Sequence, residues 1–160
     1  MLKFLALLTL LASATVHAQP PLQTDLPLKY LEQTNADTQN QPLVIFLHGY
    51  GSNEQDLFGI KDDLPASYTY LSVRAPMTME EGSYQWFRKK GEGAYNGETD
   101  DLKTSGQVLL DFIAQAAKKY HTEPDKVVLV GFSQGAIMSY EVALRHPEAV
   151  GAIAALSGRI

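Results

Sequence analysis

The sequence has 160 residues, of which 45% are apolar and 19% are charged, as is typical of a single globular domain. Thirteen Lys and Arg residues against eighteen Asp and Glu residues give a formal net charge of −5. This acidic balance, without a basic patch, argues against a nucleic-acid partner. The absence of cysteine excludes a disulfide scaffold, a thiolate zinc site and a cysteine nucleophile.

The first 18 residues have the pattern of a secretory signal peptide. Lys3 is the only charged residue before the mostly apolar run at residues 4–16, and Val16 and Ala18 are the small residues of a predicted cleavage site. A helix over this run would rise only about 20 Å, short of the ~30 Å hydrocarbon core of a bilayer, so no stable membrane span is expected. A buried N-terminal helix is the alternative. We expect export to the periplasm or the medium, with cleavage near Ala18.

Apolar runs and turn residues predict alternating strands and helices along the rest of the chain. Residues 19–41 are expected to form an N-terminal extension with a possible edge strand at 28–34, and residues 42–160 the main domain. Further strands are expected at residues 43–47, 69–73, 127–130 and 150–156. Helices are expected at residues 54–64, from residue 100 or 101 to about 120, and at 136–145. This alternation predicts an α/β fold with a mostly parallel sheet and right-handed crossovers.

Residues 77–98 have no clean hydrophobic period. The segment holds four glycines, one Trp and two Tyr, and a long irregular segment inside a compact domain is usually functional or mobile. We expect a flap that lines a cleft, with Trp86 contacting an apolar part of a substrate. The alternative is that Trp86 is a core residue.

The sharpest motif is Gly131-Phe132-Ser133-Gln134-Gly135, a G-x-S-x-G sequence. It follows an apolar strand directly and opens a helix directly, which is the context of a nucleophile elbow. The two glycines permit close backbone approach at a sharp turn, and the helix N-terminus favours negative charge. A serine N-cap in a glycine turn is the alternative interpretation.

A second motif, His48-Gly49-Tyr50-Gly51, follows the strand at residues 43–47. Acyl transfer needs backbone N–H donors that face the oxyanion, and α/β-hydrolases take one from this loop and one from the residue after the nucleophile. Alone the motif is weak, but its order relative to the elbow makes the pair of motifs specific.

Four segments together resemble one branch of the α/β-hydrolases. HGYGSNEQDLF, RAPMTMEEGSYQWF, GFSQGAIMS and ALSG follow one another between residues 42 and 158 and look like the carboxylesterase/phospholipase family, which includes acyl-protein thioesterases. The resemblance implies an α/β-hydrolase fold with a doubly wound, mostly parallel sheet. It also implies hydrolysis of a small-molecule carboxylic ester or thioester through an acyl-serine intermediate, with no metal and no organic cofactor.

The resemblance also assigns roles to individual residues. It makes Ser133 the nucleophile and gives the oxyanion N–H groups to Tyr50 and Gln134. His48 and Gly49 of the same loop are expected to lie at the substrate site. Trp86 and Phe87 are expected to line its acyl side.

The sequence departs from the family pattern after Ser133. A serine hydrolase of this fold needs an Asp and then a His after the nucleophile, whereas the only later histidine is His146, at a predicted helix end. His146 and His121 are expected to be solvated helix-end residues. We therefore expect the chain to be an incomplete, C-terminally truncated hydrolase that is inactive or nearly so by itself. The alternatives are a non-catalytic binding module on a hydrolase scaffold and a secreted peptidase or polyester depolymerase on the same fold.

Overall fold

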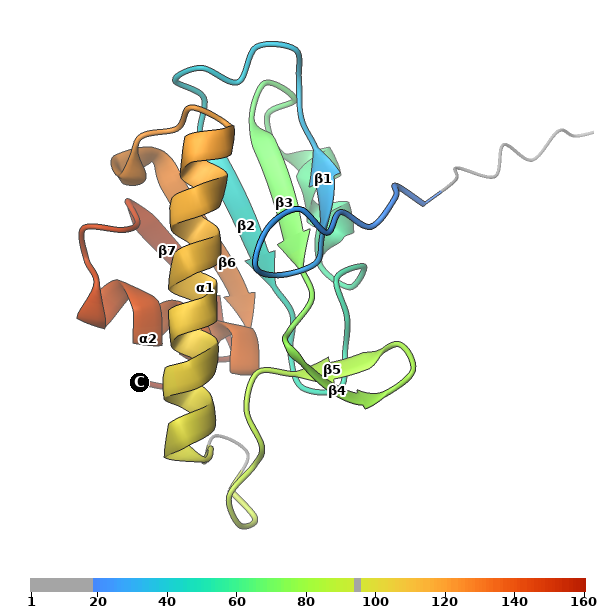
Figure 1. The fold of residues 1–160 in the computed structure, drawn as a ribbon, viewed down its shortest axis with the longest axis vertical. Helices are drawn as coiled ribbons and strands as arrows, with labels where there is room; N and C mark the ends of the chain where they lie inside the picture. Colours follow the sequence, from blue (N-terminus) through green and yellow to red (C-terminus); the bar gives the residue numbers. More distant parts are fainter. Residues whose placement is uncertain (1–18, 94–95) are drawn as a thin grey trace, which may run out of the picture.

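A computed structural model describes residues 19–93 and 96–160, which fold around a five-stranded sheet of order β1-β3-β2-β6-β7 (Figure 1). The predicted signal peptide at residues 1–18 lies outside the described residues. The strands of this sheet are β1 (Tyr30–Gln33), β2 (Leu43–Leu47), β3 (Thr69–Val73), β6 (Val127–Phe132) and β7 (Ala152–Leu156). In the described part of the chain, no helix is long and apolar enough to cross a membrane.

The sheet is parallel except at one edge. β3, β2, β6 and β7 pair in parallel, and β1 pairs antiparallel with β3. The expected mostly parallel sheet is therefore confirmed, and β1 lies within residues 28–34, where a possible edge strand was expected. The expected strands at 43–47 and 69–73 have the observed bounds of β2 and β3, and both are buried throughout. β2 is continuously apolar, as is typical of a strand covered on both faces, whereas β3 also buries Thr69 and Ser72.

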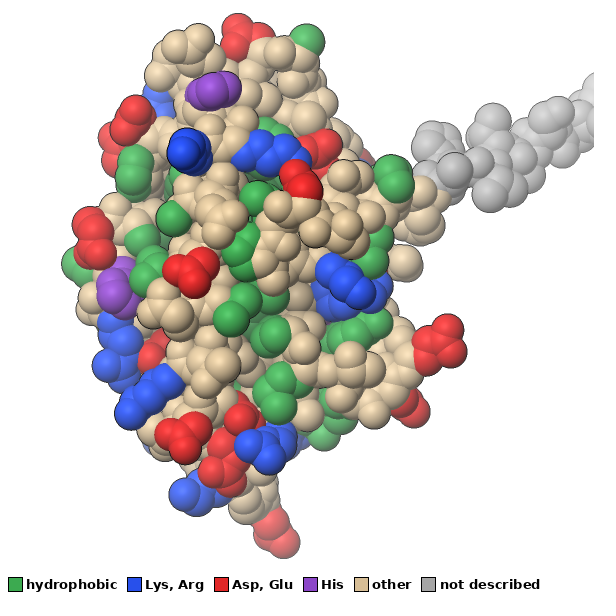
Figure 2. Space-filling model, viewed as in Figure 1, with side chains coloured by type: hydrophobic (Ala, Val, Ile, Leu, Met, Phe, Trp, Pro, Cys, Tyr) green, Lys and Arg blue, Asp and Glu red, His purple; other side chains and the backbone are tan. Residues whose placement is uncertain are grey.

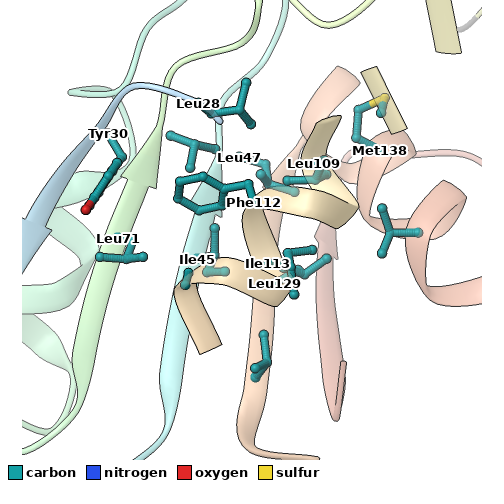
Figure 3. Packing of buried hydrophobic residues seen from close by; sticks show 14 of the residues in the cluster. Leu28, Tyr30, Ile45, Leu47, Leu71, Leu109, Phe112, Ile113, Leu129 and Met138 are labelled. Atoms are coloured by element: carbon teal, nitrogen blue, oxygen red, sulfur yellow. The ribbon is translucent and has the colours of Figure 1, made fainter. Parts of the chain in front are cut away.

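Two long helices, α1 (Thr99–Lys119) and α2 (Gln134–Arg145), lie on one face of the sheet. Their apolar sides bury the larger core against that face, as Figure 3 shows for Leu109 and Phe112 of α1, Met138 of α2 and Ile45 of β2. The buried, mostly apolar side chains of α1 recur at helical spacing, as expected of a helix with one face against a core. Lys118 and Lys119 occupy its last turn, where the helix dipole favours cations.

The opposite face of the sheet carries a smaller core. Its buried members are Leu31, Val44, Phe46, Phe58 and Tyr70. A short 3-10 helix, η1 (Phe58–Asp63), contributes Phe58. The sequence predicted a short helix at residues 54–64, and the observed 3-10 helix covers only the second half of that range. The side chain of Asn53 accepts a hydrogen bond from the backbone N–H of Gln55 at 3.0 Å, and the following turns close through i to i+3 bonds, as expected of a residue that favours turns over helix interiors.

The segment at residues 77–98 is more regular than predicted. Its first part is an antiparallel hairpin of β4 (Met77–Glu80) and β5 (Ser83–Gln85), which extends beyond the main sheet in Figure 1. Gly82 at its turn has a φ of 77°, a conformation that glycine adopts without steric cost. The segment has no clean hydrophobic period because β4 is mostly exposed and β5 is half-buried throughout. The expected flap is therefore a hairpin followed by a loop.

The last strand, β7, forms the other edge of the sheet in the described part of the chain. Its residues alternate between exposed and half-buried, and Leu156 is 46% exposed. Between α1 and β6 the chain makes a short 3-10 turn, η2 (Pro124–Lys126). On the face in Figure 2, acidic and basic side chains are interspersed.

Candidate active site

Ser133 lies on a sharp turn between β6 and α2. Its backbone has a φ of 53° and a ψ of −112°, a strained conformation for a residue with a side chain and one that clusters at functional sites. A Cβ on Gly131 would overlap the backbone of Gly135, and a Cβ on Gly135 would overlap the carbonyl of Leu47 in β2. The glycines are therefore sterically required, and the strand–turn–helix geometry expected of a nucleophile elbow is present.

The loop after β2 lies directly beside this turn. A Cβ built on Gly49 would be 3.4 Å from the Cβ of Ser133 and 3.1 Å from the ring of Phe132. Among the described residues, no hydrogen bond is found from the backbone N–H of Tyr50 or from that of Gln134. The structure thus places Tyr50 in the loop that packs against Ser133 and Gln134 directly after Ser133, as the first residue of α2.

His48 anchors this loop and does not point to the serine as a base. Its ring is 1% exposed. Nε2 accepts a hydrogen bond from the N–H of Ala75 at 3.0 Å, and Nδ1 lies 2.8 Å from the carbonyl oxygen of Gly49, so the neutral tautomer with the proton on Nδ1 satisfies both contacts. Burial lowers the pKa of His48, which favours that neutral form. This arrangement differs from the substrate contact expected of His48, because the side chain is engaged within the protein.

Trp86 and Phe87 are also more deeply placed than expected. Both are fully buried and belong to the larger core. The indole N–H of Trp86 donates to the carbonyl of His48 at 3.0 Å. The backbone carbonyl of Trp86 accepts from the hydroxyl of Ser105 on α1 at 2.5 Å. The structure therefore favours the core interpretation of Trp86 over the expected lining of a cleft, and the same burial applies to Phe87.

An ion pair and a hairpin hold the far side of the loop. Glu54 receives two hydrogen bonds from the guanidinium of Arg74, at 2.8 and 2.6 Å. Burial disfavours the charge on Glu54, but these bonds outweigh it and keep the pKa of its carboxyl below the usual value. The hairpin adds reciprocal backbone bonds between Tyr84 and the loop, from Gly51 N–H at 2.8 Å and to Ser52 O at 2.9 Å. The backbone near Ser133 is thus fixed from several sides.

The other described histidines are far from the elbow. His146 ends α2 and lies 3.4 Å from Glu148 through Nδ1, whereas Ser133 precedes the first residue of the same helix. Twelve helical residues rise about 18 Å, so this imidazole lies a whole helix away from the serine. His121 follows α1 with a φ of 53°. Within residues 19–93 and 96–160, no group of three or more His, Asp or Glu side chains is arranged to hold a metal.

Two side chains near the site were not found from the sequence. The amide of Gln134 accepts from the N–H of Trp86 at 2.9 Å and donates to the carbonyl of Phe87 at 3.0 Å. From the sequence, only the backbone N–H of Gln134 is expected to take part in the site. Ser105 was also missed, although a polar residue at a core-facing position of α1 is a usable signal for a buried hydrogen bond.

The chain is similar in sequence to known hydrolases. A sequence model of the phospholipase/carboxylesterase family matches residues 29–160. A Bacillus subtilis protein named as a hydrolase, MhqD, is 30% identical over 112 residues, covering 69% of this chain and 54% of that protein. The pimeloyl-(acyl-carrier protein) methyl ester esterase of Citrobacter koseri is 31% identical over 110 residues, covering 69% of this chain and 34% of that protein.

The fold of the chain is also similar to that of a solved carboxylesterase structure. The crystal structure of the Bacillus cereus carboxylesterase superposes with a TM-score of 0.68 at 29% sequence identity, covering 79% of this chain and 57% of that one. The chain thus spans about half the length of MhqD and somewhat more than half of this carboxylesterase. The family match extends from residue 29 to residue 160 and includes both loops around Ser133. The chain therefore belongs to the phospholipase/carboxylesterase family of α/β-hydrolases.

Proposed function

We propose that the chain carries the nucleophile and the oxyanion donors of a carboxylic ester or thioester hydrolase. The observation that carries this proposal is the placement of Ser133 on a strained turn, with the Gly49 loop packed against it. Ser133 Oγ attacks the acyl carbonyl, and the N–H groups of Tyr50 and Gln134 bind the resulting oxyanion. Preorganised donors of this kind are typically worth about 3–4 kcal/mol each.

The reaction proceeds in two steps. Collapse of the tetrahedral species expels the alcohol or thiol and leaves an acyl group on Ser133, and water then releases the acid. The proton of Ser133 needs an acceptor, and none of the three described histidines is placed to take it. We propose that a base from outside residues 19–160 completes the site, and that these residues alone turn over esters little or not at all.

The decisive experiment joins residues 29–160 to the remaining part of the Bacillus cereus carboxylesterase, which shares the fold. We expect this chimera to hydrolyse p-nitrophenyl acetate and butyrate with a burst of p-nitrophenolate, and to carry an acetyl group on Ser133. Ser133→Ala is expected to abolish both signals, whereas Ser139→Ala, which removes a buried hydroxyl from the same helix, should retain turnover.

Two outcomes would contradict the proposal. Unchanged turnover in the Ser133→Ala chimera would exclude Ser133 as the nucleophile and would favour a binding module. Turnover by residues 19–160 alone at the rate of a whole esterase, if sensitive to Ser133→Ala, would retain the nucleophile but exclude an external base.

A further inference from the structure

The side chain of Gln134 lies where the two loops of the site are joined. It is 1% exposed, and both polar atoms of its amide are engaged with the backbone of residues 86 and 87. The orientation of the amide is determined by its partners, because the N–H of Trp86 requires the oxygen and the carbonyl of Phe87 requires the nitrogen. Gln134 is thus tied through its side chain to a segment 47–48 residues earlier in the chain.

Trp86 carries the connection onward to the other loop. Its backbone N–H is held by Gln134, and its indole N–H is bonded to the carbonyl of His48, two residues before Tyr50. Its carbonyl is held by Ser105 of α1, so the whole residue has little freedom to shift. A continuous chain of hydrogen bonds therefore runs from the residue after Ser133 to the peptide that begins the Gly49 loop.

We propose that the side-chain amide of Gln134 is a positioning group. Through Trp86 it sets the spacing between the backbone N–H of Tyr50 and the backbone N–H of Gln134. This inference rests on the proposed function, because the two N–H groups act together only on an oxyanion. Rotation of the Gln134 backbone that redirects its N–H would pull a buried amide away from two partners, and buried polar groups strongly resist such a loss. Both donors are thereby held in one geometry before substrate binds, as preorganised stabilisation requires.

The first test uses Trp86, the only tryptophan of the sequence, as a reporter in the 160-residue chain. Gln134→Met keeps the shape of the side chain and removes both hydrogen bonds. Gln134→Glu places a carboxylate against the carbonyl of Phe87 at neutral pH, but its protonated form can accept and donate as the amide does. We expect both variants to change the near-ultraviolet circular dichroism and the emission of Trp86 at pH 8.

Acidification separates the two variants. At about pH 5, where a buried carboxyl with a raised pKa is protonated, the Gln134→Glu spectrum should return to that of the unsubstituted chain at the same pH. The Gln134→Met spectrum should remain altered. The control is Ser139→Ala, which removes a buried hydrogen bond to Gly135 O within α2 without touching Trp86, and which should keep the original spectrum at both pH values.

The second test measures turnover in the chimera described above. An interaction that acts only in the transition state affects kcat rather than KM, so Gln134→Met should lower kcat about ten- to hundredfold and leave KM within about twofold. An unchanged Trp86 spectrum in both variants, or a spectrum of Gln134→Glu that acid does not restore, would overturn the inference. A kcat that survives displacement of Trp86 would overturn it as well. Failure of the proposed function would give a different result, because turnover would then persist in the Ser133→Ala chimera.

Discussion

Gly135 lies against the backbone carbonyl of Leu47, so closely that a Cβ at position 135 would overlap that oxygen. The contact joins the first turn of α2 to the end of β2. The Gly49 loop follows β2 directly, and Ser133 directly precedes α2. Leu47 cannot move aside easily, because it is paired with neighbouring strands on both sides. The close approach of these two backbones therefore determines how near the elbow comes to the Gly49 loop.

We expect Gly135→Ala to be severely destabilising. The methyl group can be accommodated only by shifting α2 away from β2, and forced overpacking of this kind costs about 1–3 kcal/mol or more. The matched control is Gly59→Ala in η1, where a Cβ meets no atom within 4 Å. Urea unfolding monitored by far-ultraviolet circular dichroism should show a much lower midpoint for Gly135→Ala and a nearly unchanged one for Gly59→Ala. Similar midpoints would mean that the contact is absent in solution.

The burial of Trp86 leads to a prediction on stability and on substrate length. Trp86→Ala removes a fully buried side chain, which typically costs about 3–5 kcal/mol. Trp86→Phe should cost less in volume but leaves the carbonyl of His48 without its indole donor. Because the ring lies in the core, Trp86→Phe in the chimera should lower kcat/KM by the same factor for acetate and for long acyl esters. A loss that grows with acyl length would instead place the ring against the substrate.

The buried imidazole of His48 should make stability depend on pH. Its pKa in the folded chain is lowered by burial from an ordinary value of about 6.5, so below that pH the unfolded chain binds a proton that the folded chain does not. Stability is therefore full above about pH 6.5 and falls toward the lowered pKa, by up to about 1.4 kcal/mol per pH unit. Thermal melts between pH 7.5 and 5 should record the decline.

Two substitutions identify the group responsible for this decline. In His48→Gln, an amide oxygen can accept from the N–H of Ala75 but does not titrate, so the decline should become shallower even if the chain is less stable at pH 7.5. His146→Gln, at the far end of α2, is the control substitution, and its decline should stay steeper than that of His48→Gln. An equally steep decline in His48→Gln would assign the pH dependence to other groups.

The exposed edge strand β7 should make residues 19–160 prone to association. All five of its side chains are apolar, and an apolar edge with one unpaired side invites pairing with another chain. We expect aggregation or strong binding of the dye ANS by residues 19–160. Ala154→Lys, which places a charge at an exposed position of this strand, should reduce both. A monomeric peak in size-exclusion chromatography with a sharp cooperative melt, before any substitution, would contradict the prediction.

Export is tested at the N-terminus of the recovered protein. The pattern over residues 1–18 predicts cleavage near Ala18, so protein expressed in a Gram-negative host should appear in the periplasm and begin at Gln19. Ala18→Arg should block cleavage and leave a longer product. A cytoplasmic protein that retains Met1 in both forms would exclude a functional signal peptide.

The order of the elements and the position of the elbow can be predicted from local sequence patterns. The apolar runs of β2 and β6 and the helical period of α1 are local patterns that follow from burial. The G-x-S-x-G motif is also recognisable from five consecutive residues, although Gly135 is required by its contact with Leu47 in β2. Local patterns gave the wrong length for η1, where Asn53 favours a turn, and missed the hairpin β4–β5, whose residues are exposed or half-buried without a regular period.

The surroundings of Ser133, by contrast, depend on contacts between segments that are distant in the chain. The hydrogen bonds of Gln134 to residues 86 and 87, of His48 to Ala75 and of Trp86 to His48 join segments that are 27 to 48 residues apart in the chain. No periodicity or motif records such contacts, because they arise where loops from different strands meet at one edge of the sheet. For the same reason the sequence assigned His48, Trp86 and Phe87 to the substrate, whereas packing encloses their side chains in the protein.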